Sequence, residues 1–272
     1  MRTSAWAWAL RGFCCRFTVS PTPNPPAAAL ANKAVDAVIP GQPYAFMSVH
    51  DGTAVALLAG DALLVQGSSL LRKECQSLKQ EQKELIPHLV SEALMRISKA
   101  EAKENHLKRR LDVTPEEYLK VIKLRAVVPE VHCRIGGILA DATPRMIEFL
   151  AHYGRTFGVV STVGGEFLDL MEYQEFQNRL KNECPTLPML CALQNVKDNA
   201  KLKLILGDKN LTRSKADTIV KTVMSSEEVG ALKRDTLSII NEEIVKVATI
   251  LRSPEGKEAT LLLQAAASLL QN

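Results

Sequence analysis

A series of helix-start signals runs along the chain, and it constrains the fold more than any other feature. A serine or threonine heads several amphipathic segments, often followed by proline or acidic residues, and its side chain can accept a hydrogen bond from the free N–H groups of a helix start. Strand-like alternation of apolar and polar residues does not extend over a useful length. The sequence therefore predicts an all-α fold, with helices joined by short loops as in a large bundle. The predicted starts lie at Thr114, Thr143, Thr212, Ser225 or Ser226, and Ser253.

The composition agrees with a helical chain. Aromatic residues make up only 5% of the sequence, while leucine, alanine, glutamate, lysine and valine dominate, which is a mixture that favours helices. A chain of 272 residues with 46% hydrophobic content can bury a large core. Composition alone favours neither one domain nor two.

Two long segments precede Thr114. Residues 53–71 form an apolar run in which Gly60 and Gly67 are spaced to allow close helix packing. Residues 72–111 carry a long charged amphipathic pattern. We expect the helix that begins after Thr114 to be kinked or ended by Pro129. The expected apolar stripe of residues 72–111 consists of Leu78, Leu85, Leu89, Ala93, Ile97 and Ala100.

The first forty residues differ from the rest and are assigned to a leader, expected to be disordered. Residues 1–32 contain arginines, serines and threonines, and the first acidic residue is Asp36. This composition resembles an organelle transit peptide, although an upstream start codon or a fused leader would explain it equally well. The predicted location is the cytoplasm, or a mitochondrion or plastid if residues 1–32 act as a transit peptide.

Charge, hydropathy and cysteine spacing exclude several classes of function. The net charge of +4 is small for this length, and the absence of a basic patch with interleaved aromatics argues against nucleic-acid binding. The longest apolar run, residues 45–71, is interrupted by His50, Asp51 and Asp61, so we expect a protein that is not transmembrane. Six cysteines without a C-x-x-C pair indicate free thiols rather than a zinc site.

The stretch from Tyr153 to Pro188 carries the strongest functional signal. Glu166 and Asp169 are three residues apart, so in a helix they project to the same side and could share a divalent cation. Lys181, with Arg179 two residues before it, supplies positive charge close by. This is the arrangement expected around a metal-bound diphosphate.

The same stretch resembles the second half of the trans-prenyltransferases, the polyprenyl diphosphate synthase family. That family carries a run of the form FQ-x-x-DD-x-x-D, preceded by YG-x-x-x-G and followed by a basic turn ending in TLP. Here Asp169 is the unchanged acid of that run, while Gly165 and Glu166 stand in place of the paired aspartates. The matching flanks are Tyr153, Gly154 and Gly158 before the run, and Thr186, Leu187 and Pro188 after it.

Other segments extend the resemblance from Gly41 to the C terminus. Residues 41–43, 60–61 and 114–118 resemble the family's glycine-x-proline turn, its "AGD" helix and its "T-x-EEY" helix start. Residues 123–139 resemble the helix that carries a diphosphate-binding lysine-threonine pair, and Lys123 and Arg125 straddle that position. The resemblance thus implies a truncated prenyl synthase-like domain over residues 41–272, with Glu166 and Asp169 as metal ligands and Lys181, Lys123 and Arg125 as diphosphate ligands.

The resemblance also implies a chemistry that this chain lacks in part. The family uses magnesium held between two aspartate-rich motifs to neutralise a departing diphosphate. Where the first motif should lie, this sequence has the single acid Asp36, so we expect magnesium binding to be weak or absent, and no catalytic residue is assigned. The chain is interpreted as a polyprenyl synthetase-like protein of isoprenoid biosynthesis, elongating prenyl diphosphates directly or serving as a noncatalytic partner subunit. The alternative is a dead or truncated helical scaffold that binds neither metal nor prenyl diphosphate.

Expected partners follow from the same interpretation. Allylic or isopentenyl diphosphate is the candidate ligand. We expect a homo-oligomer, or a heteromer with an active synthase, formed through the small-residue helices around Gly60–Gly67 and Gly136–Gly137.

Overall fold

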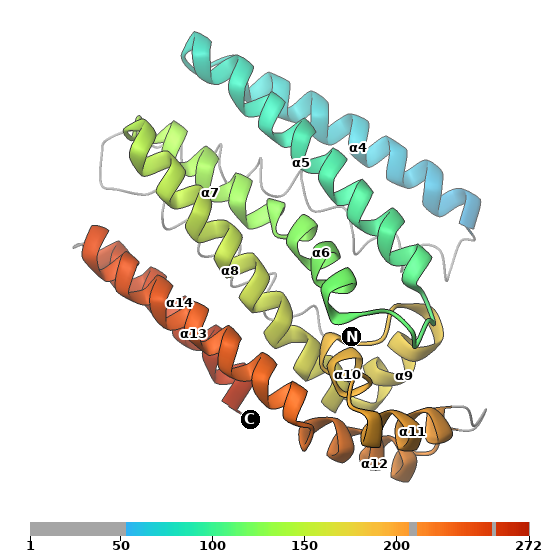
Figure 1. Cartoon of the computed structure of the whole chain (residues 1–272). Helices are drawn as coiled ribbons and strands as arrows, with labels where there is room; N and C mark the ends of the chain where they lie inside the picture. Colours follow the sequence, from blue (N-terminus) through green and yellow to red (C-terminus); the bar gives the residue numbers. More distant parts are fainter. Residues whose placement is uncertain (1–52, 207–210, 252–253, 272) are drawn as a thin grey trace. The chain divides into compact units, whose positions relative to one another are not determined.

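The computed structural model describes residues 53–206, 211–251 and 254–271, and every regular element in these ranges is a helix (Figure 1). The all-α prediction is therefore confirmed for this part of the chain. The leader assigned to residues 1–40 lies outside the described residues, as does the transit-peptide hypothesis for residues 1–32. Within the same ranges, no helix combines the length and the hydropathy needed to cross a bilayer.

The described residues form two compact units. The first comprises the residues up to Met95 together with Pro129–Gly154, and the second comprises Arg96–Val128 and the residues from Arg155 onward. Helices α5 (Gln80–Leu107) and α8 (Pro144–Met171) contribute residues to both units. Each unit is described by itself below.

The first unit contains α4 (Thr53–Cys75), the first half of α5, most of α7 (Val127–Leu139) and the start of α8. Helices α7 and α8 approach closely at two glycines. A Cβ atom on Gly154 would lie 2.3 Å from the carbonyl oxygen of Pro129, and one on Gly137 would lie 3.1 Å from the side chain of Ile147. Gly137 therefore serves packing within the chain.

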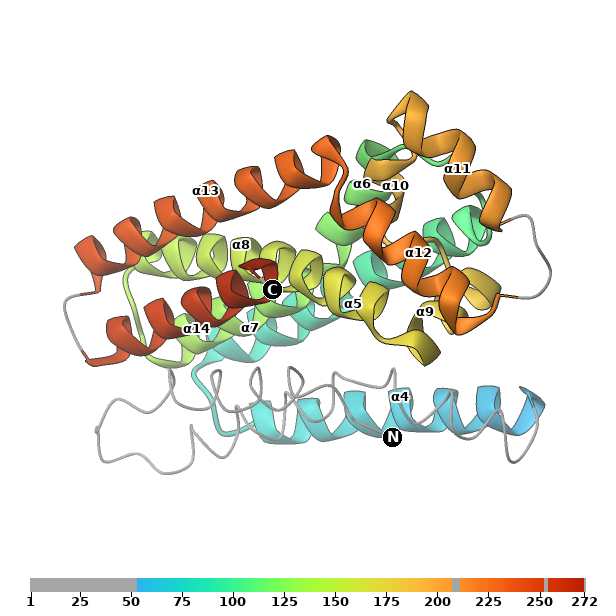
Figure 2. The same ribbon diagram turned by 90° about the horizontal axis from the view of Figure 1, so that it is seen from below.

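The second unit holds the rest of the chain. It contains the second half of α5, all of α6 (Pro115–Arg125) and the second half of α8. Two short helices come next, α9 (Tyr173–Asn182) and α10 (Leu187–Ala192). They are followed by α11 (Val196–Leu206), α12 (Arg213–Met224), α13 (Glu227–Ile250) and α14 (Pro254–Gln271). Helices α13 and α14 lie side by side (Figures 1 and 2). The aromatic core of this unit consists of Tyr118, Phe157, Phe167 and Phe176, all fully buried.

Three of the predicted helix starts carry the expected side-chain caps, whereas Ser226 precedes α13 without a side-chain capping bond, and Ser253 lies outside the described residues. The side-chain oxygens of Thr114, Thr143 and Thr212 each accept a hydrogen bond from the backbone N–H three residues later, at 3.2, 3.3 and 3.4 Å. Two boundaries differ from expectation. The amphipathic segment 72–111 is broken between α4 and α5, and α6 ends at Arg125, before Pro129. Pro129 instead lies in the first turn of α7, where its missing N–H costs no hydrogen bond.

Candidate functional site

A buried ionic cluster in the second unit centres on Arg179 of α9. The residue is only 4% exposed, and its guanidinium forms ion pairs with Glu166 of α8 and, at 2.9 Å, with Glu183 just beyond α9. Two further carboxylates lie close, Asp169 at 3.6 Å and Glu104 at 3.7 Å. One guanidinium thus faces four carboxylates supplied by α5, α8 and the end of α9.

Glu166 is held by more than its ion pair. Its Oε1 accepts a hydrogen bond from the Tyr118 hydroxyl at 3.0 Å, and its Oε2 accepts one from the backbone N–H of Leu187 at 2.9 Å. The N-cap residue of α10, Thr186, makes no side-chain capping bond. Glu166 therefore caps α10 from another helix and ties α6, α8, α9 and α10 together.

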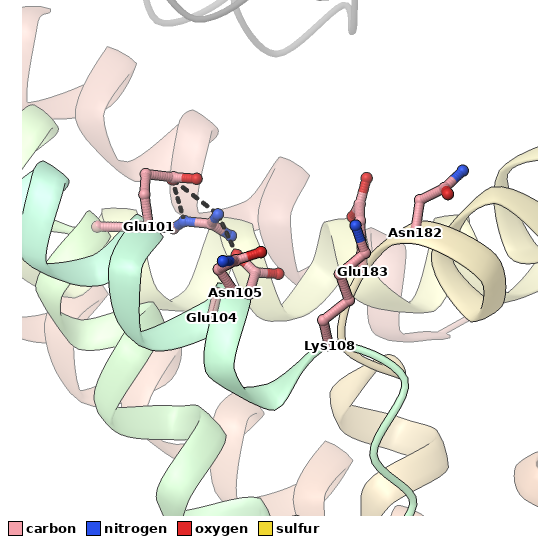
Figure 3. Close-up of a pocket in the computed structure, with 7 residues that line it drawn as sticks. Glu101, Glu104, Asn105, Lys108, Asn182 and Glu183 are labelled. Atoms are coloured by element: carbon pink, nitrogen blue, oxygen red, sulfur yellow. Dashed lines mark hydrogen bonds and ion pairs between the residues drawn. The ribbon is translucent and has the colours of Figure 1, made fainter.

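A second arginine extends the cluster to the surface. Arg125 of α6 forms ion pairs with Glu101, at 2.8 Å, and with Glu104, so that Glu104 lies near both arginines. A pocket of about 230 Å³ lies beside Arg125 and its two glutamate partners. Figure 3 shows Glu101 and Glu104 on α5 and Asn182 and Glu183 at the end of α9. The pocket is lined by Glu101, Glu104, Asn105, Lys108, Arg125, Asn182 and Glu183.

Burial and charge shift the pKa values of the clustered groups. Burial disfavours the charged form of Arg179, but the neighbouring carboxylates, Glu166 foremost, raise its pKa overall and keep it a cation. Burial raises the pKa of Asp169 to about 6, although Arg179 opposes this shift. Burial likewise raises the pKa of Glu104 against the attraction of Arg125 and Arg179. The cluster therefore contains a permanent cation with two buried carboxylate neighbours, Glu104 and Glu166. Its other two carboxylates, Asp169 and Glu183, keep more than a third of their side chains exposed.

The structure brings together some of the residues singled out in the sequence. Glu166 and Asp169 do face the same side of α8, and the group between them is Arg179. Arg125 joins the cluster through Glu104. Lys123 and Lys181 are exposed, and the backbone carbonyl of Lys181 accepts a hydrogen bond from Arg109.

The sequence did not reveal the roles of Tyr118, Glu104 and Glu183. Tyr118 lies in the segment that resembles the family's helix start, but nothing in its spacing indicates a hydrogen bond to a residue 48 positions later. Glu104 belongs to an amphipathic helix with many acidic residues, which gives it no distinguishing mark. The sequence indicates Arg179 only as a positive charge close to Glu166 and Asp169, because its place at the centre depends on the packing of α9 against α8.

The carboxylates in this arrangement do not fit a magnesium ion. Magnesium requires six oxygen ligands in near-octahedral geometry, with carboxylate oxygens open to it. Both oxygens of Glu166 are instead occupied by protein donors, and Arg179 lies between Glu166 and Asp169. Across residues 53–206, 211–251 and 254–271, no three acidic, histidine or cysteine side chains are grouped as a metal-ligand set.

Comparisons with known proteins define the class of this fold. The chain superimposes on a geranylgeranyl pyrophosphate synthase from Lactobacillus brevis with a TM-score of 0.78, covering 99% of this chain and 87% of that one at 16% identity. A decaprenyl diphosphate synthase from Rhodobacter capsulatus gives a TM-score of 0.75, covering 98% and 86% at 14% identity. The architecture is therefore that of the all-α isoprenyl diphosphate synthases.

The sequence comparison places the chain in a family. Residues 41–223 match the model of the polyprenyl synthetase family, and the chain belongs to that family. A short chain isoprenyl diphosphate synthase from Methanothermobacter thermautotrophicus is 26% identical over 222 residues, which cover 78% of this chain and 66% of the relative. A geranylgeranyl diphosphate synthase from Methanosarcina mazei is 25% identical over 220 residues, covering 79% and 65%. The chain thus spans about two thirds of the length of these relatives.

Proposed function

We propose that the chain acts in prenyl diphosphate chain elongation as a noncatalytic partner subunit of an active synthase. Membership of the polyprenyl synthetase family supports the reaction class. One observation favours the subunit role: Arg179 neutralises Glu166 and Asp169 at the position where the family resemblance implies a metal-binding motif. Prenyl transfer in this family depends on magnesium to neutralise the diphosphate, and we propose that magnesium binding by this chain is weak or absent.

The residues named from the sequence receive revised roles in this proposal. Glu166 and Arg125 serve chiefly as ion-pair anchors, because both are engaged within the cluster. Asp169, with 37% of its side chain exposed, is the proposed metal-facing acid once Arg179 no longer occupies the space beside it. Lys123 and Lys181 are exposed, and we propose them as the contacts for an allylic or isopentenyl diphosphate.

Elongation by the chain itself is the second candidate. The printed names of the relatives support it, since each is a diphosphate synthase. Elongation by this chain requires magnesium to replace the guanidinium of Arg179 as the partner of Glu166 and Asp169. The family match gives no support to a scaffold that is unrelated to prenyl diphosphates.

The proposal includes how the chain assembles and where it is located in the cell. We propose a heteromer with an active synthase, or a homo-oligomer where no such partner is present. The proposed location is the cytoplasm, with a mitochondrion or plastid as the alternative if residues 1–32 are a transit peptide. Exposed leucines on α4, such as Leu57 and Leu58, support an association surface in the first unit.

Co-expression with a full-length polyprenyl synthetase from the same source tests the proposal. We expect the two chains to purify together and the synthase to change its rate or its product length when this chain is present. A matched reaction uses the partner with its aspartate-rich motifs changed to alanine. Product from that complex would have to be made by this chain, which would contradict the noncatalytic role. Failure of the chains to associate, with no effect on the partner, would reject the subunit role itself.

A further inference from the structure

The cluster around Arg179 carries an inference about metal binding that deepens the proposed function. We infer that the guanidinium of Arg179 substitutes for a divalent cation between Glu166 and Asp169, so that these carboxylates stay closed to metal until Arg179 is removed. The inference rests on the proposed function only in identifying these carboxylates as the family's metal-facing motif. It concerns the isolated chain and needs no partner.

The geometry supports an internal cation rather than an ordinary surface ion pair. Arg179 is 4% exposed and Glu166 is 3% exposed, so the pair is shielded from water and from screening by salt. Glu183, four residues after Arg179, binds the same guanidinium at 2.9 Å and holds it in position. The planar guanidinium can bind several carboxylates at once, which a single lysine ammonium does less well.

A dissolved metal ion would have to displace a tethered competitor. Arg179 belongs to the same chain as its carboxylates, so its effective concentration at the site is far above that of free magnesium. Metal binding to Glu166 would also break its hydrogen bonds with Tyr118 and with the N–H of Leu187. Magnesium in addition gives up its own water only reluctantly. Each of these costs favours the guanidinium.

Removing Arg179 changes this balance. Glu166 and Asp169 would then face one space without a cation between them, and two neighbouring carboxylates favour binding of a shared positive ion. Gly165 lies one residue before Glu166, and a Cβ atom placed there meets nothing within 4 Å. A Cβ atom therefore has open space at position 165, and an aspartate there would lie four residues before Asp169, on the same face of α8.

The inference is tested by titrating the purified full chain with Mn²⁺. The electron paramagnetic resonance signal of the free ion measures how much Mn²⁺ is bound. We expect Arg179→Gln to bind Mn²⁺ about tenfold more tightly than the unchanged chain, which corresponds to about 1.4 kcal/mol. Gly165→Asp alone should stay close to the unchanged chain because Arg179 is still present. The double variant should bind most tightly. Arg145→Gln, which removes an exposed arginine, is the control for the loss of one charge.

Two results would overturn the inference. One is equal Mn²⁺ affinity in the unchanged chain and in Arg179→Gln. The other is a magnesium-specific rise in melting temperature of the unchanged chain, relative to sodium chloride of equal ionic strength, that Asp169→Asn removes. This second measurement stands even if Arg179→Gln fails to fold. Loss of partner association in the co-expression experiment would reject the proposed function and leave these metal measurements unaffected.

Discussion

Replacing Glu166 with glutamine removes one charge from the cluster while keeping the side-chain shape. In the structure, Arg179, Tyr118 and the N–H of Leu187 all donate to the two carboxylate oxygens. A glutamine amide turns one of those acceptors into a donor, so at least one of the three partners loses its acceptor. We therefore expect Glu166→Gln to destabilise the fold.

The magnitude follows from the burial of the pair. Breaking a buried ion pair by removing one partner costs about 3–5 kcal/mol. Glu183, Asp169 and Glu104 all lie within 3.7 Å of the Arg179 guanidinium and still balance its charge. We therefore expect the lower end of the range, about 3 kcal/mol.

Urea unfolding followed by circular dichroism measures this loss. Glu172→Gln is the matched control, because Glu172 is an exposed acid at the start of α9, and its change should stay within about 0.5 kcal/mol. The double variant Glu166→Gln with Arg179→Met should cost less than the sum of the two single changes, since each single change leaves the other charge unpaired. An unchanged or higher stability of Glu166→Gln would refute the reasoning. It would show that the charge of Glu166 destabilises the folded chain, as expected for a ligand-binding carboxylate, and does not hold α6, α8, α9 and α10 together.

Three further predictions concern stability. Gly165→Ala should stabilise the chain by about 0.5–1 kcal/mol, because Gly165 is a helical glycine with open space around its Cβ position. Gly154→Ala should destabilise it by about 1–3 kcal/mol, because the added Cβ would clash with the backbone of Pro129. Thermal unfolding of the two variants measures both changes. Burial lowers the pKa of His132 to about 4 from its ordinary 6.5. The unfolded state therefore takes up a proton first at His132, so this residue alone should lower the stability by about 2 kcal/mol at pH 5. Asp169 acts in the opposite direction, because its raised pKa makes the folded state take up the proton first. Urea unfolding at pH 7 and pH 5 of the unchanged chain and of His132→Leu should show that the unchanged chain loses more stability at pH 5 than the variant, by this amount. An equal change of stability in the two proteins would contradict the assignment to His132.

The helices were predictable because their signals are local. A threonine at 114, 143 or 212 caps the residues directly after it, so the start can be recognised within a few positions of sequence. Which face of a helix becomes buried depends on neighbours far away in the chain. In α5 the sequence pattern favoured Leu85 and Leu89, whereas the structure buries Ile86 and Val90.

In the candidate site, too, the features set by local spacing were predictable, and those set by contacts between distant residues were not. The three-residue spacing of Glu166 and Asp169 correctly predicted a shared face of α8, since the period of a helix determines it. That the cation on this face is Arg179 could not be read from spacing, because it follows from the packing of α9. The contact between Tyr118 and Glu166 joins residues 48 positions apart, and only the tertiary fold brings them together.

Synthase activity of the isolated chain tests the central claim most directly. The measurement is incorporation of labelled isopentenyl diphosphate into an allylic diphosphate in the presence of magnesium. Because Arg179 neutralises the carboxylates of α8, the account predicts no more than trace product from the purified chain alone. Robust turnover that Asp169→Ala abolishes would contradict the account and establish the chain as a synthase in its own right.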